Sequence, residues 1–459
     1  MLTRRHLLVL TALSLLIIVS GCSDRNLTDL EAARALIDPL VFDEAIDDVY
    51  FQPFSGTDPY VVSLDSTFAR EGDWSLKVTV PPAGSALGGY AGGVLTAVNA
   101  RDLADFNALT FWARSNVAVN LNTAGFGNDN TGTSLYGASR GNIPLTTDWT
   151  YFVIPIPAPE KLISERGMFT IAEGWEEPYT EGHAVWFDEI RFAEIDGIAD
   201  PYPVLSPAVK YSFIGATSQA GSAYTRYSVD GQFVNVDHSP NYFQLVSADP
   251  AVAVIDGNDI RVVGAGEVQI TATMGDLECA GYVYFFTYEP PTTAPDAPTL
   301  PAGDVISVFS DAYDDIPVDD WNPDWGQSTE VSDFVVAGET TKMYASLNWA
   351  GIDFQSNTVD VTGMTHLHLD IYAPTGDFFN VKIVAFDGDG GNNLEEVSLE
   401  FEETTTPAFV SGGWSSLDIP IADFGLTVPA DHIGQIIFST PSGSTGAPLV
   451  LVDNIYWHR

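Results

Sequence analysis

Positively charged residues are scarce in this chain of 459 residues, which has 18 lysines and arginines against 62 aspartates and glutamates. The formal net charge at pH 7 is −44. A surface this acidic repels nucleic-acid phosphates and anionic lipid headgroups, so it disfavours both as partners. It also disfavours a polyanionic polysaccharide, because the sequence shows no local basic cluster that would bind one. A neutral ligand agrees better with this charge, as does a saline medium whose counter-ions screen the self-repulsion.

Cysteine is almost absent, since the chain has only Cys22 and Cys279. Cys279 lies in an apolar run, which predicts a buried structural thiol rather than a reactive one. If Cys22 is modified, Cys279 has no partner within the chain for a disulfide bond. The apolar run at residues 7–19 follows Arg4 and Arg5 and is too short for a membrane-spanning helix. A basic start, a short apolar run and small residues before Cys22 form the pattern of a secretory signal.

The segment 19–22, Val-Ser-Gly-Cys, resembles the lipobox of bacterial lipoproteins. This resemblance implies cleavage before Cys22, acylation of that residue and firm anchoring, since each buried methylene contributes about 0.8 kcal/mol. We therefore expect a lipid-anchored protein that contacts the membrane through this anchor alone. Ser23 favours the outer membrane, with the chain at the cell surface and residues 23–38 as a polar tether. The alternative is a secretory signal without lipidation, in which Cys22 is incidental.

Beyond the tether, the sequence lacks a long amphipathic helix. Segments such as 109–113, 149–154 and 268–273 are rich in β-branched and aromatic residues, and Gly, Asn, Asp and Pro clusters bound them. Many short strands separated by turns are typical of β-sandwiches. The predicted fold class is therefore all-β.

Two segments are predicted to be linkers, at residues 197–207 and 289–301. The second is rich in Pro and Thr and should be extended and semi-rigid. They divide the chain into three predicted modules, at 39–196, 204–288 and 302–459. The first and third modules share four features in the same order, which predicts one fold used twice. The features are Phe with a following Asp (42–43 and 309–311), a strand ending in a turn (109–116 and 367–376), Trp followed by Ile-Pro-Ile (149–156 and 414–421) and a closing strand with one Asp (184–192 and 449–457).

The middle module resembles a group 2 bacterial Ig-like domain, through residues 247–254 and 263–272. Such domains usually serve as spacers. The outer modules resemble jelly-roll carbohydrate-binding modules. Residues 75–78, the Trp and Ile-Pro-Ile segments, and the motifs at 187–190 and 452–455 carry this resemblance. The third module is also similar to the C-terminal β-domain of marine bacterial lipoproteins and secreted glucanases. These resemblances imply three β-sandwiches in the order jelly roll, Ig-like, jelly roll.

The resemblances imply a surface glycan-binding lipoprotein that captures a neutral polysaccharide, with a laminarin-like β-glucan as the expected ligand. Other glycan-uptake proteins at the cell surface are its expected partners. A structural or adhesive surface protein with the same sandwiches is the main alternative, and a glycoside hydrolase is a second one. The laminarinase motif Glu-x-Asp-x-x-Glu comes nearest to a match at residues 194–199, where Ala199 stands in place of the acid/base Glu. We therefore predict that the protein is not an enzyme.

Tryptophan placement predicts where a sugar would bind. Five of the ten Trp lie in the first module, five in the third and none in the middle one. Sugars stack their C–H faces on aromatic rings and need polar side chains for their hydroxyls. Trp321 and Trp325 lie in a polar, Pro-containing loop where no apolar period requires them, and Trp349 could join them. The alternative is that the loop tryptophans cap the end of the sandwich.

In the first module, Trp175 also lies in a predicted loop. Tyr136, Arg140 and Glu173 are expected near it as further ligand contacts. The guanidinium of Arg140 suits vicinal hydroxyls or a carboxylate. A salt bridge with one of the many carboxylates is the alternative role of Arg140.

The resemblance to jelly rolls also implies a structural calcium ion near the ends of each outer module. It assigns Asp43 and Asp188 in the first module, and Asp311 and Asp453 in the third, as ligands together with backbone carbonyls. Separately, residues 387–393 form an oxygen-rich, Gly-containing turn that could be a calcium loop. An acidic hairpin without an ion is the alternative there.

Overall fold

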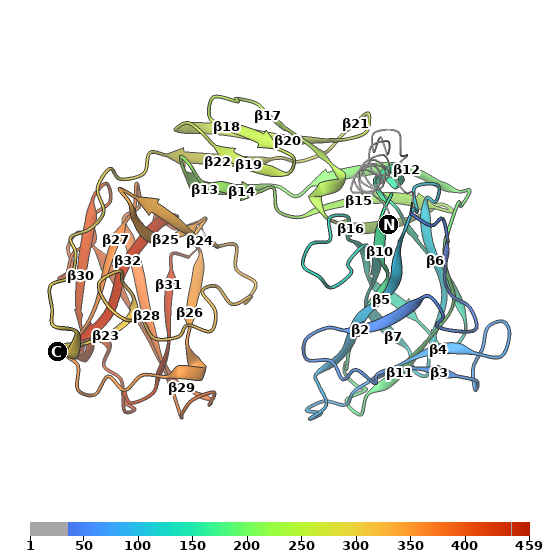
Figure 1. Cartoon of the computed structure of the whole chain (residues 1–459), viewed down its shortest axis with the longest axis horizontal. Helices are drawn as coiled ribbons and strands as arrows, with labels where there is room; N and C mark the ends of the chain where they lie inside the picture. The colour runs from blue at the N-terminus through green and yellow to red at the C-terminus, as the bar shows by residue number, and fades with distance from the viewer. Residues whose placement is uncertain (1–34, 442) are drawn as a thin grey trace, which may run out of the picture.

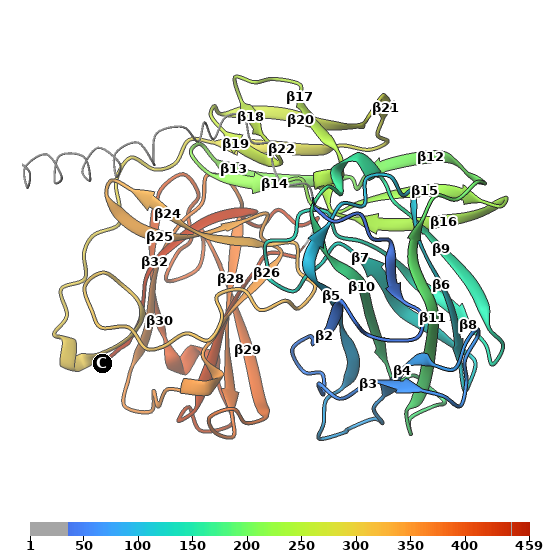
Figure 2. The same cartoon turned by 45° about the vertical axis from the view of Figure 1, so that its right-hand side comes forward.

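The computed structural model describes residues 35–441 and 443–459. Within these ranges the chain forms β-strands and short 3-10 helices, which confirms the all-β fold class and its β-sandwich modules. In the described part, no helix is long and apolar enough to cross a membrane. The predicted lipidation site, Cys22, lies outside the described residues. Figure 1 shows a middle module that bridges two outer modules, and Figure 2 shows the same arrangement from a second direction.

The first module is a sandwich of two antiparallel sheets. Sheet 1 has the strand order β3-β4-β11-β6-β9, with β1 paired to β11, and sheet 2 contains β2-β5-β10-β7-β8. The strands are β1 (Leu40–Phe42), β2 (Val49–Pro53), β3 (Val62–Asp65), β4 (Ser75–Val80), β5 (Tyr90–Arg101), β6 (Ala108–Ser115), β7 (Val119–Phe126), β8 (Ala138–Leu145), β9 (Thr150–Pro155), β10 (Glu165–Gly174) and β11 (His183–Ala193), with the 3-10 helix η2 (Pro159–Lys161).

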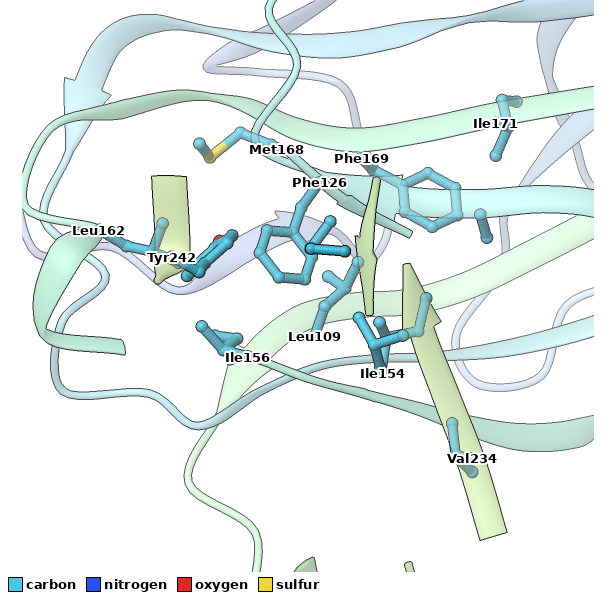
Figure 3. Close-up of a cluster of buried hydrophobic side chains, with 14 of the residues drawn as sticks. Leu109, Phe126, Ile154, Ile156, Leu162, Met168, Phe169, Ile171, Val234 and Tyr242 are labelled. Atoms are coloured by element: carbon cyan, nitrogen blue, oxygen red, sulfur yellow. The ribbon is translucent and has the colours of Figure 1, made fainter. Parts of the chain in front are cut away.

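The core of this sandwich consists of the residues that alternate inward from both sheets. Phe111 of sheet 1 contacts Phe169 of sheet 2 edge to face, with ring centroids 5.3 Å apart, and both rings contact Phe187. Figure 3 shows the part of this core around Leu109, Phe126 and other buried side chains. Aromatic pairs in this geometry contribute beyond the area they bury. Burial of these rings is what holds the two sheets together.

The middle module has two smaller sheets. Sheet 3 has the order β13-β22-β20-β17, with β21 on β20 and a parallel pairing between β13 and β22, and sheet 4 has the order β14-β19-β18. The strands are β13 (Ala208–Phe213), β14 (Thr217–Gln219), β17 (Gln244–Ser247), β18 (Ala253–Asp256), β19 (Asp259–Val262), β20 (Gly266–Met274), β21 (Leu277–Glu278) and β22 (Val283–Tyr288), with the 3-10 helix η3 (Pro240–Tyr242).

Three further strands extend sheet 2 from the first module toward the middle one. They are β12 (Ile198–Leu205), β15 (Ala223–Val229) and β16 (Gln232–His238), and β16 pairs with β8 through Asp237 and His238. The prediction of an irregular linker at 197–207 is therefore wrong for most of its length. β-Branched and aromatic residues are sparse there, so only the pairing with β15 makes this segment a strand.

The third module repeats the first. Sheet 5 has the order β24-β25-β32-β27-β30 with β23 on β32, and sheet 6 has the order β26-β31-β28-β29. The strands are β23 (Val305–Phe309), β24 (Glu330–Val336), β25 (Glu339–Ala345), β26 (Trp349–Asp353), β27 (His366–Tyr372), β28 (Phe378–Phe386), β29 (Asn393–Glu402), β30 (Trp414–Pro420), β31 (Ile433–Ser439) and β32 (Leu449–His458), with the 3-10 helices η4 (Ala302–Asp304), η5 (Gln355–Asn357) and η6 (Ile421–Phe424). Each strand of sheet 5 takes the place of one in sheet 1, which confirms one fold used twice.

The closing strand of each outer module contains the same local irregularity. Glu189 and Asn454 have positive φ angles of 47° and 50°. The preceding aspartate stabilises this backbone: the N–H of Glu189 donates to Asp188 Oδ1 at 2.8 Å, and the N–H of Asn454 donates to Asp453 Oδ1 at 2.7 Å. An Asp that hydrogen-bonds to its own backbone supports such turns. The Asp shared by the two closing strands therefore stabilises the positive-φ backbone of the residue that follows it.

The middle and third modules share an apolar interface. Phe213 of β13 packs with Met343 of β25 and Leu451 of β32 in one buried cluster. The segment at 289–301 is attached to the third module, because the Trp414 indole N–H donates to the Thr293 carbonyl at 2.7 Å. The Tyr313 hydroxyl donates to the Leu300 carbonyl at 3.1 Å. The linker is therefore fixed along sheet 5.

Candidate functional site

The outer face of sheet 6 carries two of the predicted tryptophans. On β26, Ala350 and Ile352 are fully buried in the core of the third module. Successive residues of a strand point to opposite faces, so Trp349, Gly351 and Asp353 face outward. Trp349 is 36% exposed at the start of the strand. The outward side of β26 therefore presents an aromatic ring, a glycine without a side chain and a carboxylate in one row.

Polar side chains from the neighbouring strands continue the same face. The register places Ser439, Ile437 and Gln435 of β31 opposite the three outward positions of β26, followed by Asn380 and Lys382 of β28. We call these five residues, together with Trp325, Trp349 and Asp353, the sheet 6 face. Apart from Ile437 and the two rings, all of its side chains are hydrogen-bond donors or acceptors.

Trp325 packs against this face at Gly351. A Cβ atom at Gly351 would overlap the six-membered ring of Trp325, so only glycine allows this contact. The side chain of Trp325 remains 41% exposed. The six-membered ring thus covers Gly351, two residues from Trp349 along β26, while part of the indole faces solvent. Two exposed rings fixed on one polar surface are what sugar stacking requires.

The loop that carries Trp325 is held in place by a dense set of hydrogen bonds. Its first residues form a short antiparallel bridge with β26. The N–H of Asp320 donates to the Asp353 carbonyl at 3.1 Å, and the N–H of Asp353 donates to the Asp320 carbonyl at 2.8 Å. The backbone N–H of Trp325 donates to Gln327 Oε1 at 2.7 Å, and the Thr329 hydroxyl donates to the Trp349 carbonyl at 2.7 Å. A ring positioned before the ligand arrives costs less entropy on binding.

The structure separates the predicted loop pair. Trp321 is partly buried against the third-module core, edge to face with Phe309 at a centroid distance of 5.6 Å. Lys342 Nζ lies 4.2 Å from its ring centroid and is ion-paired to Asp333. Trp321 therefore packs on the core, which favours the alternative that it caps the sandwich, and its stacking on a sugar beside Trp325 gains no support here.

We expect Trp321→Ala to lower the free energy of unfolding by about 1–2 kcal/mol, because it removes a partly buried ring and a cation–π contact. Glycan affinity should change less than twofold, since this ring does not reach the sheet 6 face. Denaturant unfolding and affinity electrophoresis on the same preparation measure the two effects. A large loss of affinity in a folded Trp321→Ala variant would show that Trp321 contacts the glycan.

The polar part of the sheet 6 face is also internally connected. Gln435 Nε2 donates to Asp353 Oδ1 at 3.1 Å, and Lys382 Nζ pairs with Glu396 at 3.0 Å. The aromatic rings supply stacking, while Asp353, Gln435 and Lys382 offer acceptors and donors for hydroxyls. Gly351 is a further residue of this face that was not predicted, although the alternation of residues 349–353 could have identified it as outward-facing.

The residues predicted in the first module do not form one site. Glu173 is 2% exposed; its carboxylate lies 2.9 Å from His183 Nε2 and accepts the Asn122 N–H at 2.7 Å. A buried carboxylate with both oxygens occupied cannot contact a sugar, so this prediction is wrong. Sequence showed an acidic residue before Trp175, but not that β10 turns it inward.

The other three first-module candidates point in different directions. The Tyr136 ring packs on Tyr242 with centroids 5.4 Å apart, at the contact with the middle module. Arg140 lies on β8 with its guanidinium 6.0 Å from the Phe152 ring, and burial lowers the pKa of this group. It makes no salt bridge in the described residues. Trp175 is 39% exposed directly after β10, whereas Glu173, two residues before it, is buried.

The first module has a longer loop than the third at the corresponding position. Between β7 and β8, residues 127–137 fold over sheet 2: the backbone of Asn128 lies against Gly167, and Asn130 Nδ2 donates to the Pro53 carbonyl at 3.4 Å. The corresponding β28–β29 connection has only residues 387–392. The equivalent face is therefore partly covered in the first module and open in the third.

The predicted calcium ligands have different surroundings in the two modules. Asp188 is 1% exposed, and its oxygens accept the N–H groups of Arg70 at 2.7 Å, Glu71 at 3.4 Å and Glu189 at 2.8 Å. These donors occupy both oxygens of Asp188, although the pairing of Phe42 with Ile190 places Asp43 close to it. The calcium prediction for Asp43 and Asp188 gains no support from this arrangement and stays a prediction.

In the third module the carboxylates fit a cation better. Asp453 is 6% exposed and pairs in register with Asp370 of β27, which is also 6% exposed. Burial raises the pKa of Asp453 to about 7, and the charges of Asp311, Asp370 and Glu339 add to this increase. Asn454 donates to both carboxylates, through its N–H to Asp453 and its side-chain amide to Asp370. The repulsion between these two buried like charges would be relieved by a hard cation such as calcium.

The oxygen-rich turn at 387–393 is internally hydrogen-bonded. Asp387 Oδ1 accepts the N–H of Asn392 at 2.6 Å, and Asp389 Oδ1 accepts the N–H of Thr358 at 3.1 Å. Hydrogen bonds from the side chains of Asn392 and Thr358, supported by these N–H bonds, hold the pKa values of Asp387 and Asp389 below their ordinary range. The arrangement agrees with an acidic hairpin.

No protein-family model matches the sequence, and no curated protein is similar to it at a significant level. Among solved structures, a family 30 carbohydrate-binding module of a cellulosomal cellulase of Clostridium thermocellum is 18% identical, with 35% of this chain and 99% of that chain covered and a TM-score of 0.27. A family 11 carbohydrate-binding module from the same organism is 16% identical, with 29% and 84% covered and a TM-score of 0.23. A β-1,2-glucanase from Parabacteroides distasonis is 13% identical, with 56% and 40% covered and a TM-score of 0.24. Likeness at these levels assigns neither a family nor a ligand.

Proposed function

We propose that the protein binds a neutral polysaccharide on the sheet 6 face of its third module. The observation that carries the proposal is the pair of exposed rings, Trp325 on Gly351 and Trp349 at the start of β26, above a row of polar side chains. The rings stack on successive sugar faces, and Asp353, Gln435 and Asn380 accept or donate hydrogen bonds to hydroxyls. A flat, open face suits an extended polymer better than a small sugar.

The proposed ligand is a laminarin-like β-glucan. The net charge of −44 supports a neutral chain, because polyanions would be repelled. Affinity electrophoresis against laminarin, other neutral glucans, mannan, xylan and a uronic-acid polymer tests this directly. Binding to none of the neutral polymers would contradict the proposal and favour a structural or adhesive role.

We further propose that the protein acts without catalysis and is anchored by acylated Cys22 at the outer membrane, facing the medium. The N-terminal signal pattern supports this location. In a chain anchored at Cys22, the sheet 6 face belongs to the last of the three modules, where it can bind polymer from the medium. Reducing-end detection after incubation with the same polysaccharides tests the absence of catalysis.

We also propose a structural calcium ion held by Asp311, Asp370 and Asp453. At ten times its dissociation constant the ion should stabilise the protein by about 1.4 kcal/mol, which corresponds to roughly 3–5 °C in the transition of the third module. Calorimetry with calcium and then with excess chelator measures the shift. The Asp453→Asn variant should lose it while Asp188→Asn keeps it, and a shift that survives Asp453→Asn would place the ion elsewhere.

A further inference from the structure

Three of the seven histidines lie together on the outer face of sheet 5, the side of the third module opposite the sheet 6 face. His366 and His368 belong to β27, and His458 belongs to β32. Asp418 of β30 is their neighbour. The residues between them along the strands are fully buried, so these four side chains point outward: Leu367, Leu369, Leu417, Ile419 and Trp457.

The register brings these side chains within ligand distance of one another. His366 pairs with His458 across β27 and β32, and His368 pairs with Asp418 across β27 and β30. One ligand atom from each of His366, Asp418 and His458 lies within 4.8 Å of the other two. The two imidazoles are stacked with centroids 5.2 Å apart and planes at 10°. The rings are thus aligned at one edge of the cluster.

His458 has an oxygen atom against each ring nitrogen. Nδ1 lies 3.0 Å from the Arg459 carbonyl oxygen, and Nε2 lies 2.7 Å from Asp418 Oδ1. A neutral imidazole carries one N–H and satisfies only one of these acceptors. When Nδ1 donates to the carbonyl, the lone pair of Nε2 faces a carboxylate. A cation between Nε2 and Oδ1 would satisfy both groups.

The surroundings resemble the support that metal-bound histidines usually have. Such a ligand commonly donates its second N–H to a carbonyl or another fixed oxygen. His458 has the Arg459 carbonyl for this purpose, and Nδ1 of His366 lies 2.8 Å from the Thr365 hydroxyl. In the described residues, the ion pairs of Asp418 involve histidines and no lysine or arginine.

We propose that His366, His458 and Asp418 form a binding site for a divalent transition-metal ion of the zinc class. Two imidazole nitrogens and a carboxylate oxygen suit zinc, whereas calcium takes oxygen ligands alone. Tetrahedral coordination requires the 2.7 Å separation of Nε2 and Oδ1 to widen to about 3.3 Å. Asp418 is 49% exposed and free to rotate by this amount. Water or His368 would complete the coordination.

The test uses the purified protein after treatment with a chelator. Titration with zinc in a calorimeter should show one site per chain, apart from any binding by the N-terminal segment. Cobalt bound at the same site should give the visible absorption of a tetrahedral ion. His458→Ala and, separately, His366→Gln should each weaken zinc binding at least tenfold. His432→Ala is the matched control, because this partly exposed histidine lies outside the cluster and, in the described part of the chain, forms its ion pair with Asp431. It should leave binding unchanged.

Several outcomes overturn the proposal. They are the absence of zinc binding, full affinity in either folded site variant, an equal loss in His432→Ala, and displacement of zinc by an equal concentration of calcium. Thermal unfolding of each variant separates loss of the site from loss of the fold. Laminarin binding is measured in parallel, so the failure of this site and the failure of the sheet 6 face are distinguishable.

Discussion

Replacing Trp325 and Trp349 together by alanine should lower the affinity of the protein for a soluble neutral β-glucan by about 100-fold. Each exposed ring on the sheet 6 face offers a stacking platform, and truncating such an anchor typically costs about 1–3 kcal/mol. A tenfold loss for each single variant follows from the middle of that range, at about 1.4 kcal/mol per tenfold change. Affinity electrophoresis in laminarin gels and calorimetry measure the loss.

Two matched controls make this result specific. Trp321→Ala removes a tryptophan from the same loop but from the packed side, where it contacts Phe309. Trp175→Ala removes a ring of similar exposure, 39%, from the first module. Both variants should retain at least half of the affinity. If the double variant binds as well as the unaltered protein, the sheet 6 face is not the binding site.

The second large effect is expected at Asp453, as a dependence of stability on pH. The folded protein holds the pKa of this carboxyl at about 7, mainly through burial, whereas its ordinary value is 3.8. Between these two values the folded state keeps a proton that the unfolded state has released. The free energy of unfolding therefore falls as pH rises from about 4 to 7 and is constant above 7. The full shift corresponds to at most about 4 kcal/mol.

Asp453→Asn should remove the part of this loss that Asp453 causes, while Glu165, whose pKa burial also raises to about 7, keeps its own part. The amide oxygen can still accept the Asn454 N–H, while the charge beside Asp311 and Asp370 disappears. In the presence of chelator, the variant should therefore be more stable than the unaltered protein at pH 8, by about 2–4 kcal/mol, and similar to it at pH 4. Denaturant titrations across this range give the two curves.

Glu400→Gln is the control for the general effect of removing a negative charge. Glu400 is exposed on β29, away from Asp453, so its variant should follow the pH profile of the unaltered protein. A slope in Asp453→Asn as steep as that of the unaltered protein would contradict the assignment to Asp453.

Much of the fold could be predicted from the sequence because strand signals are local. Alternating apolar residues and turn residues identified the closing strands of both outer modules, and the structure gives these modules the same strand order in sheets 1 and 5. The segment at 197–207 could not be predicted this way. Its strand β12 exists because β15 offers backbone partners, and such partners are distant in sequence.

The sequence allowed only part of the candidate site to be predicted. A polar loop with Trp325 and a Trp beside Asn348 suggested exposed rings, and both are exposed in the structure. Their companions could not be judged in this way. The sequence shows Trp321 and Glu173 in equally polar surroundings, but only strand register and sheet packing decide whether a side chain faces the core or solvent.

The sequence by itself determined the all-β class, the repetition of one module and a surface charge that disfavours anionic ligands. These properties depend on composition and on patterns a few residues long. Only the tertiary structure placed Trp325 on Gly351, covered sheet 2 with residues 127–137, and gathered His366, His458 and Asp418 on sheet 5. Each of these arrangements joins residues from different strands or loops, because neighbouring positions in a sheet are set by backbone pairing.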